Sequence, residues 1–203
     1  LFGGGIQVLQ AEMPGTGITR LKPQMAQTAR LLWSLYFFMT VVEILLLSIV
    51  ADIPLYDAIC NSFSTVSTGG FSPQRDSIGA YDSPLAMGIV TFFMLISGIN
   101  FVILYYVFNS LIDFSRDFSD RLRSSFKILR ENEELLFYLN LVLFSFSLIF
   151  ITLVLDTKNG NSNFSKFSHA SFQTVSLLTG TGFTTSNYSL WPQVSIFVLL
   201  LAM

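Results

Sequence analysis

The sequence has a single histidine, a single cysteine and few charged residues. Only 12% of its 203 residues are Asp, Glu, Lys or Arg. Because Cys60 is alone, an intrachain disulfide is excluded, and with one histidine a zinc cluster of cysteines and histidines is excluded as well. The few basic residues form no aromatic-interleaved surface, so nucleic-acid binding is not indicated.

The residues needed for catalysis are also missing. A membrane enzyme requires clustered acids, bases or nucleophiles, whereas the apolar segments carry almost no ionisable group besides Glu43. We interpret His169, inside a short amphiphilic segment, as a polar or interfacial residue. The Gly-rich residues 179–182 lack the following lysine and the soluble context of a phosphate-binding loop. We therefore predict a protein that is not an enzyme and has no cofactor.

Hydrophobic residues dominate the chain instead. They make up 52% of it, and the mean hydropathy is +0.61, well above that of soluble domains. Three apolar segments, residues 31–50, 84–112 and 135–155, are long enough to cross a bilayer, and a fourth begins at Pro192. The fourth stops at about half a span, and the chain lacks an initiator Met, so we expect an interior piece of a longer protein. The predicted fold class is an all-α membrane protein.

Two short amphiphilic segments, residues 55–67 and 165–178, lie between the spans. Pro54 and Asp57 favour a helix start, but about 13 residues reach only about 20 Å and cannot cross. Each segment leads into a Gly/Thr-rich stretch, residues 64–72 and 178–185. Irregular backbone at membrane depth is tolerated only where protein shields it or where it lines a wet cavity. The pattern therefore predicts two re-entrant loops whose carbonyl groups face a cation.

The two halves of the chain repeat each other. An offset of 112 pairs Ser64 with Ser176 and Gly70 with Gly182. We predict four regions, and each is given with its residues: a cytoplasmic connection (1–30), a first helix–pore loop–helix repeat (31–112), a charged cytoplasmic linker (113–134), and a second repeat truncated in its last helix (135–203).

The basic residues predict the orientation of these regions. Of the eleven Lys and Arg residues, eight lie in the first thirty residues and the linker, and only Arg75, Lys158 and Lys166 lie elsewhere. By the positive-inside rule the linker is cytoplasmic and both loops face outward.

Within the spans, Glu43 either binds an ion or faces a helical neighbour or a polar residue such as Asn100.

The order of span, short helix, Thr-x-Gly-Phe loop and span resembles potassium-channel-like pores. The absence of a second glycine after the aromatic residue is similar to the Trk/Ktr/HKT superfamily of potassium transporters. Residues 11–15, 63–72, 98–101 and 181–183 resemble its bacterial TrkH subunits, and the likeness extends over nearly all 203 residues. It corresponds to the second and third of that family's four repeats.

The resemblance implies potassium uptake through a multi-pass protein of the inner (plasma) membrane. It implies a homodimer, a cytoplasmic nucleotide-binding regulatory subunit, and a filter completed by the remaining repeats, with potassium as transported substrate. Two alternatives stay open: a pore selective for sodium or ammonium, and a membrane assembly subunit without transport. We expect the Phe rings to pack behind their loops. The backbone oxygens expected to bind the ion belong to Thr68, Gly69, Gly70, Phe71, Gly180, Thr181, Gly182 and Phe183.

Overall fold

The computed structural model describes residues 18–100, 103, 104, 107, 110, 125, 129–155, 162–188 and 191–202. All regular secondary structure in these residues is helical. The chain divides into two compact units between Phe37 and Phe38, inside helix α2 (Ile18–Ile49). The described part of the first unit is the beginning of α2, and the candidate site lies in the second unit.

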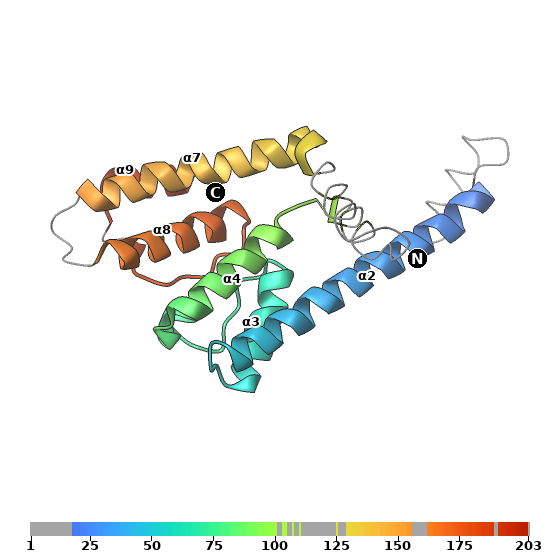
Figure 1. The fold of residues 1–203 in the computed structure, drawn as a ribbon, viewed down its shortest axis with the longest axis horizontal. Coiled ribbons are helices and arrows are strands. Elements are labelled where there is room, and N and C mark those ends of the chain that lie inside the picture. The colour runs from blue at the N-terminus through green and yellow to red at the C-terminus, as the bar shows by residue number, and fades with distance from the viewer. Residues whose placement is uncertain are drawn as a thin grey trace, which may run out of the picture. The chain divides into compact units, whose positions relative to one another are not determined.

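Two halves of the chain show the same order of elements. In the first half, α2 is followed by α3 (Leu55–Val66), the 3-10 helix η1 (Ser77–Tyr81) and α4 (Pro84–Ser97). In the second half, α7 (Glu133–Leu155) is followed by α8 (Asn163–Leu178) and α9 (Gln193–Ala202). Helix α8 packs against both α7 and α4 (Figure 1). The short helices α3 and α8 lie where the sequence predicts them, within two residues at each end.

Local polar residues fix where the helices begin. Ser83 accepts the Ala86 N–H at 3.3 Å, with proline following at the first helical position of α4. Ser162 accepts the Ser165 N–H at 3.2 Å at the start of α8. Because the first N–H groups of a helix have no partner inside it, such side chains stabilise its start by about 1 kcal/mol.

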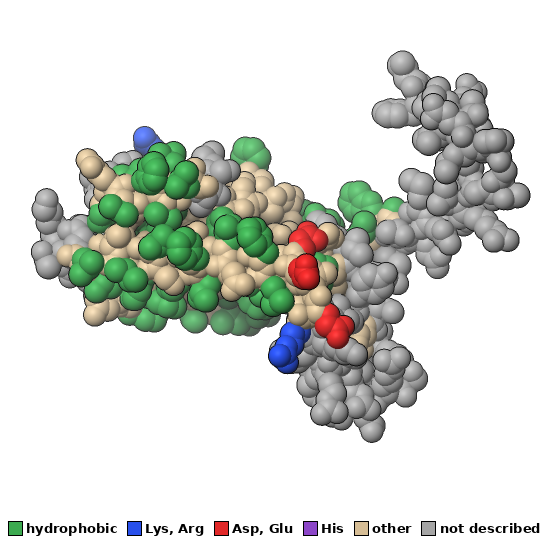
Figure 2. All heavy atoms as spheres, turned by 90° about the horizontal axis from the view of Figure 1, so that it is seen from above, with side chains coloured by type: hydrophobic (Ala, Val, Ile, Leu, Met, Phe, Trp, Pro, Cys, Tyr) green, Lys and Arg blue, Asp and Glu red, His purple; other side chains and the backbone are tan. Residues whose placement is uncertain are grey.

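Two described stretches are long and apolar enough to cross a membrane, Leu32–Ile49 and Glu133–Leu155. Figure 2 shows apolar side chains spread over the face formed by α7 and α9, with acidic side chains gathered at one end. Large apolar residues of α7, such as Phe137, Phe144 and Leu155, are mostly exposed. A helix with so much uncovered apolar surface is suited to contact with lipid.

The predicted continuous span over residues 84–112 is wrong, because α4 ends at Ser97. The Gly98 N–H still bonds the Met94 carbonyl oxygen, but the Ile99 N–H bonds that of Ile96, which tightens the last turn. Described residues beyond Asn100 are helical again, starting with the Ile103 N–H bonded to the Asn100 carbonyl oxygen. Residues 1–17 and most of the predicted linker lie outside the described residues.

One apolar cluster joins the two halves. It contains Leu47 of α2, Ile78 of η1 and Met87 of α4 from the first half, and Phe172 and Phe183 from the second. Since these side chains are buried together, the loop that follows α8 is held against the core of the first half.

Candidate functional site

The two predicted pore loops have matching backbones. Loop 1 (residues 68–71) follows α3, and loop 2 (residues 180–183) follows α8. Thr68 and Gly70 have φ of 52° and 70°, and their counterparts Gly180 and Gly182 have 71° and 83°. Left-handed conformations thus alternate at the same places in both loops. Glycine adopts them without steric cost, so Gly70 and Gly182 permit this backbone.

The loops lie directly against each other. A Cβ atom placed on Gly70 would overlap the carbonyl oxygen of Thr181 and lie 3.0 Å from its carbonyl carbon and 3.4 Å from that of Gly182. Residues 111 and 112 positions apart in the sequence are therefore in backbone contact. Each loop also begins at the C-terminal end of its short helix, where the helix dipole is negative and favours a cation.

A serine fastens each loop to its own helix. Ser64 of α3 accepts the Phe71 N–H at 2.5 Å, and its carbonyl oxygen accepts the Gly69 N–H at 2.7 Å. In the second half, Ser176 donates to the Phe183 carbonyl oxygen at 2.7 Å and accepts the Gly182 N–H on its own carbonyl at 3.1 Å. The same serine position thus restrains both loops, with the side-chain hydrogen bond reversed in direction.

In the first half, a polar cluster braces the chain after the loop. Asp57 of α3 accepts from the Gln74 amide at 2.8 Å and from the Tyr81 hydroxyl at 2.9 Å, while Asn61 donates to Tyr81 at 3.0 Å. Burial, together with Asp57, raises the pKa of Tyr81 to about 12, so the hydroxyl stays protonated and donates. The residues after loop 1 are thereby tied back to α3.

His169 is the counterpart of Asp57 at an offset of 112. Its Nδ1 lies 3.0 Å from the Thr185 hydroxyl, just after loop 2. Burial lowers the pKa of His169 from its usual 6.5, although the nearby Asp82 opposes the shift. The half-buried histidine therefore braces the second loop and is more than an interfacial surface residue.

The first half also holds the second loop directly. The Gly79 N–H donates to the Thr184 carbonyl oxygen at 3.1 Å, and the Thr184 N–H donates to the Ser77 hydroxyl at 3.3 Å. The two backbones approach so closely that a Cβ on Gly79 would lie 2.7 Å from the Thr185 carbonyl oxygen. Helix η1 follows loop 1 in the chain and is hydrogen-bonded to Thr184, the residue after loop 2. It therefore links the C-terminal ends of the two loops.

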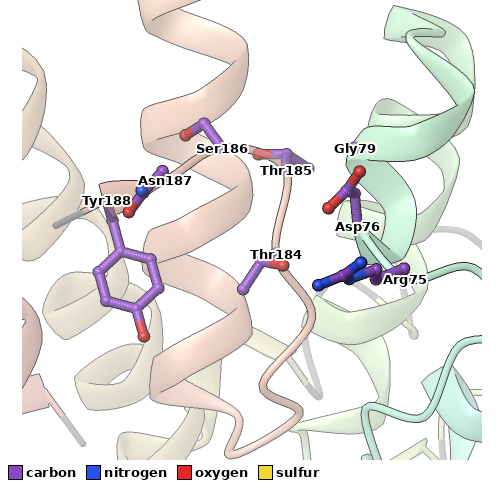
Figure 3. Close-up of a pocket in the computed structure, with 8 residues that line it drawn as sticks. All are labelled: Arg75, Asp76, Gly79, Thr184, Thr185, Ser186, Asn187 and Tyr188. Atoms are coloured by element: carbon purple, nitrogen blue, oxygen red, sulfur yellow. The ribbon is translucent and has the colours of Figure 1, made fainter. Parts of the chain in front are cut away.

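A cavity of about 510 Å³ opens beside this connection. Figure 3 shows Arg75 and Asp76 on one side, the backbone through Thr184 and Thr185 in the middle, and Tyr188 on the other side. Its walls carry both charges together with hydroxyl and amide groups. Thr184, which lines this cavity, directly follows loop 2.

The predicted packing of the two Phe rings holds for only one of them. Phe183 is completely buried, whereas Phe71 is 81% exposed. The expectation that Phe71 packs behind its loop is therefore wrong within the described residues. Phe183 is covered by the first half, and none of the described residues covers Phe71 in the same way.

Glu43 is fully buried beside Thr65 of α3. Its carboxyl oxygens have no hydrogen-bond partner among the described residues, since the Thr65 hydroxyl donates to the Asn61 carbonyl oxygen instead. Asn100 is not its partner, because the Asn100 amide lies 3.3 and 3.4 Å from the Glu134 carboxyl oxygens. Glu43 thus lies beside the short helix α3, and whether it binds an ion or only faces a neighbouring helix stays a prediction.

Sequence reasoning did not identify the residues that support the loops. Ser64 and Ser176 were paired by the repeat offset, which was a usable signal, but their hydrogen bonds to the loops were not predicted. The contacts of Ser77 and Gly79 with loop 2 join distant segments and left no local pattern in the sequence.

Comparisons with known proteins agree with this geometry. Residues 4–203 match the TrkH family, described as "Cation transport protein". The chain belongs to the TrkH family. A family of cation transport proteins confirms the prediction that the chain is not an enzyme. The helical structure of the described residues, together with the likeness to a solved TrkH structure, confirms the predicted all-α membrane fold.

Individual relatives support the same assignment. The chain is 35% identical over 192 residues to "Trk system potassium uptake protein TrkH" of Salmonella typhimurium, covering 93% of this chain and 36% of the relative. It is 34% identical over 201 residues to "Trk system potassium uptake protein TrkG" of Escherichia coli K12, covering 98% and 38%. The crystal structure of the potassium transporter TrkH from Vibrio parahaemolyticus superposes with a TM-score of 0.79 at 29% identity, covering 94% of this chain and 37% of that one. The chain thus spans little more than a third of the length of each of these three relatives.

Proposed function

We propose that this chain supplies two of the loops that line a potassium-selective uptake pore. The ion would be held by backbone carbonyl oxygens of the eight residues of loops 1 and 2. The observation that carries the proposal is the backbone contact between Gly70 and residues 181 and 182, made by two loops with the same alternation of left-handed residues. Carbonyl groups arranged in this way replace part of an ion's water shell.

Potassium is favoured over other cations by the relatives. The similar TrkH and TrkG proteins are named as potassium uptake proteins. The negative ends of α3 and α8 add a preference for a cation at the loops. Because two loops do not encircle an ion, further loops complete the ring, as four repeats would in one chain.

The proposed organisation follows the sequence prediction. Residues 31–112 and 135–203 form the two helix–pore loop–helix repeats, and the linker at 113–134 and residues 1–30 lie on the cytoplasmic side. The protein resides in the inner (plasma) membrane. A homodimer and a cytoplasmic nucleotide-binding regulatory subunit remain predictions that rest on the family resemblance alone.

Replacing Gly70 or Gly182 by serine in the full-length protein tests the proposal. A Cβ at Gly70 overlaps the Thr181 carbonyl group, and at Gly182 the φ of 83° is strained for any side chain. We expect each variant to reach the membrane but to lose at least about tenfold of its potassium-over-sodium selectivity, roughly 1.4 kcal/mol of discrimination. The measurement is flux of the two ions into vesicles that contain the purified protein.

Gly88→Ser provides the matched control. Gly88 lies in α4, and a Cβ there meets no atom within 4 Å. The control should retain wild-type selectivity. Unchanged selectivity in both Gly70→Ser and Gly182→Ser would refute the filter, and a wild-type preference for sodium or ammonium would refute potassium as the substrate.

A further inference from the structure

Glu43 is a buried acidic residue in a membrane-spanning stretch, and it belongs to neither loop. Its side chain has no exposed surface, and neither carboxyl oxygen has a hydrogen-bond partner among the described residues. None of the described basic side chains forms an ion pair with it. An unpaired carboxylate in this setting is very costly, because burial removes the water that stabilises its charge. The carboxyl group therefore needs either a proton or partners that the neighbouring helices supply.

One face of α3 lies against the face of α2 that carries Glu43. Leu47, one turn after Glu43, shares a buried apolar cluster with Ala58 of α3, and Glu43 itself neighbours Thr65 (Figure 1). The two helices consequently run in opposite directions along each other. Ser62 lies on the same face of α3, one turn from both Ala58 and Thr65, and its buried hydroxyl has no partner among the described residues. This register places Glu43 and Ser62, two unpartnered polar groups, at the same level of the interface.

The hydrogen bond of Thr65 decides which form of Glu43 fits this face. A threonine hydroxyl has a single proton, and Thr65 donates it to the Asn61 carbonyl oxygen at 2.8 Å. Towards Glu43, the Thr65 oxygen can therefore only accept. An ionised carboxylate also only accepts, whereas a protonated carboxyl group donates to Thr65. The other oxygen of the protonated group can then accept from the Ser62 hydroxyl.

The apolar neighbours favour a proton over a bound cation. Met39 and Leu47, one turn to either side of Glu43 on α2, are buried apolar residues, as is Ala58 on α3. A dehydrated cation needs several oxygen atoms in place of its water shell, and these side chains offer none.

We propose that Glu43 is a positioning residue of loop 1, held as a neutral carboxylic acid that donates to Thr65 and accepts from Ser62. The connection to the loop is short, because the Thr65 carbonyl oxygen accepts the Thr68 N–H at 3.0 Å. Thr68 is the left-handed first residue of loop 1, so fixing this turn of α3 restrains how the loop leaves the helix. The inference rests on the proposed function and adds a support that lies behind α3.

Infrared difference spectroscopy of the full-length protein tests the protonation. The C=O stretching band of a protonated carboxyl group is separate from the bands of carboxylates. We expect the difference between wild type and Glu43→Gln at neutral pH to contain this band. Ser62→Ala should shift the band to higher frequency, because the carbonyl oxygen loses a hydrogen bond. Absence of the band would show an ionised Glu43 and would overturn the inference, as would an unshifted band in Ser62→Ala.

Flux of potassium and sodium into vesicles tests the effect on loop 1. Glutamine keeps a donor and an acceptor in the same shape, so Glu43→Gln should retain wild-type selectivity. Glu43→Leu removes both and should lose at least about threefold of the potassium-over-sodium selectivity, since it leaves Ser62 and Thr65 without this partner. In the matched control Ser171→Ala, the lost hydroxyl bonds only the Ser168 carbonyl oxygen among the described residues, within the other short helix α8. Its selectivity should equal that of wild type.

Ser62→Ala removes one oxygen atom and covers the case in which Glu43→Leu does not fold. It should lower selectivity in the same direction. Wild-type selectivity in Ser62→Ala and in a folded Glu43→Leu would overturn the positioning role. A loss in Glu43→Gln as large as in these variants would show that the charge is required, and would also overturn it.

The infrared band does not depend on which ion crosses the membrane. A wild-type preference for sodium would contradict the proposed function. The positioning role would stand if, in that same protein, the band were present and Ser62→Ala altered the ion preference.

Discussion

Single residues decide how the loops are held. Ser64 and Ser176 each form a side-chain hydrogen bond to the aromatic residue of their loop, one as acceptor and one as donor. Both serines are buried, and removing either hydroxyl leaves the backbone group of its loop without this partner. A buried polar group left without a partner costs about 1 to 3 kcal/mol.

Alanine at Ser64 or Ser176 should therefore loosen a loop without unfolding the protein. We expect each variant to lose about 1 to 3 kcal/mol of stability and a measurable part of its potassium selectivity. Thermal unfolding in detergent and vesicle flux measure the two effects. Ser147→Ala is a suitable control, because among the described residues its hydroxyl bonds the Leu143 carbonyl oxygen within its own helix α7 and no loop residue. Selectivity equal to wild type in both loop variants would show that the tethers are dispensable.

His169 makes stability depend on pH. Its pKa in the folded protein lies below 6.5, the value of the unfolded chain, because burial disfavours the charged ring. Below pH 6.5 the unfolded state binds a proton that the folded state does not yet accept, so stability falls as the pH decreases. We expect the melting temperature to fall between pH 7.5 and 5.5.

The variant His169→Asn isolates this effect, since asparagine can still bond the Thr185 hydroxyl but does not titrate. Its melting temperature should change less over the same pH range. Identical profiles for the variant and the wild type would mean that other groups cause the dependence.

At the scale of elements, the end of α4 is closely packed against neighbouring helices. A Cβ on Gly98 would lie 2.6 Å from the Tyr138 hydroxyl oxygen and 2.9 Å from the Thr179 Cγ2. Tyr138 also donates to the Leu95 carbonyl oxygen at 3.2 Å. Three helices, α4, α7 and α8, therefore meet where a side chain has no room.

Gly98→Ala should destabilise the protein by about 1 to 3 kcal/mol through overpacking. Removing the hydroxyl in the double variant Gly98→Ala with Tyr138→Phe should recover part of that loss, since the closest atom is gone. A double-mutant cycle from thermal unfolding measures the coupling. Strictly additive effects would show that the glycine and the tyrosine do not share this contact.

The sequence predicted the short helices well because their signals are local. Proline, serine and acidic residues mark where α3 and α8 begin, and the Gly/Thr-rich stretches mark where they end. The end of α4 was missed because no charged residue interrupts residues 84–112, although Ser97, Gly98 and Asn100 lie at the break. The candidate loops were found from their repeated motif, while their support by Ser77 and Gly79 depends on tertiary structure.

At the scale of the molecule, the two halves of the chain contact each other at the loops. Helix η1 of the first half holds Thr184 of the second, and the first half's core covers Phe183. Loop 1 presents Phe71 without such a cover among the described residues.

We propose that backbone oxygens of loops 1 and 2, together with those of further loops, hold a dehydrated potassium ion. Crystals of the full-length protein grown with rubidium in place of potassium test it most directly, because rubidium scatters anomalously and resembles potassium in size. We predict anomalous peaks on an axis shared by the backbone oxygens of residues 68–71 and 180–183. Rubidium bound only away from these loops, in a protein that still transports it, would contradict the account.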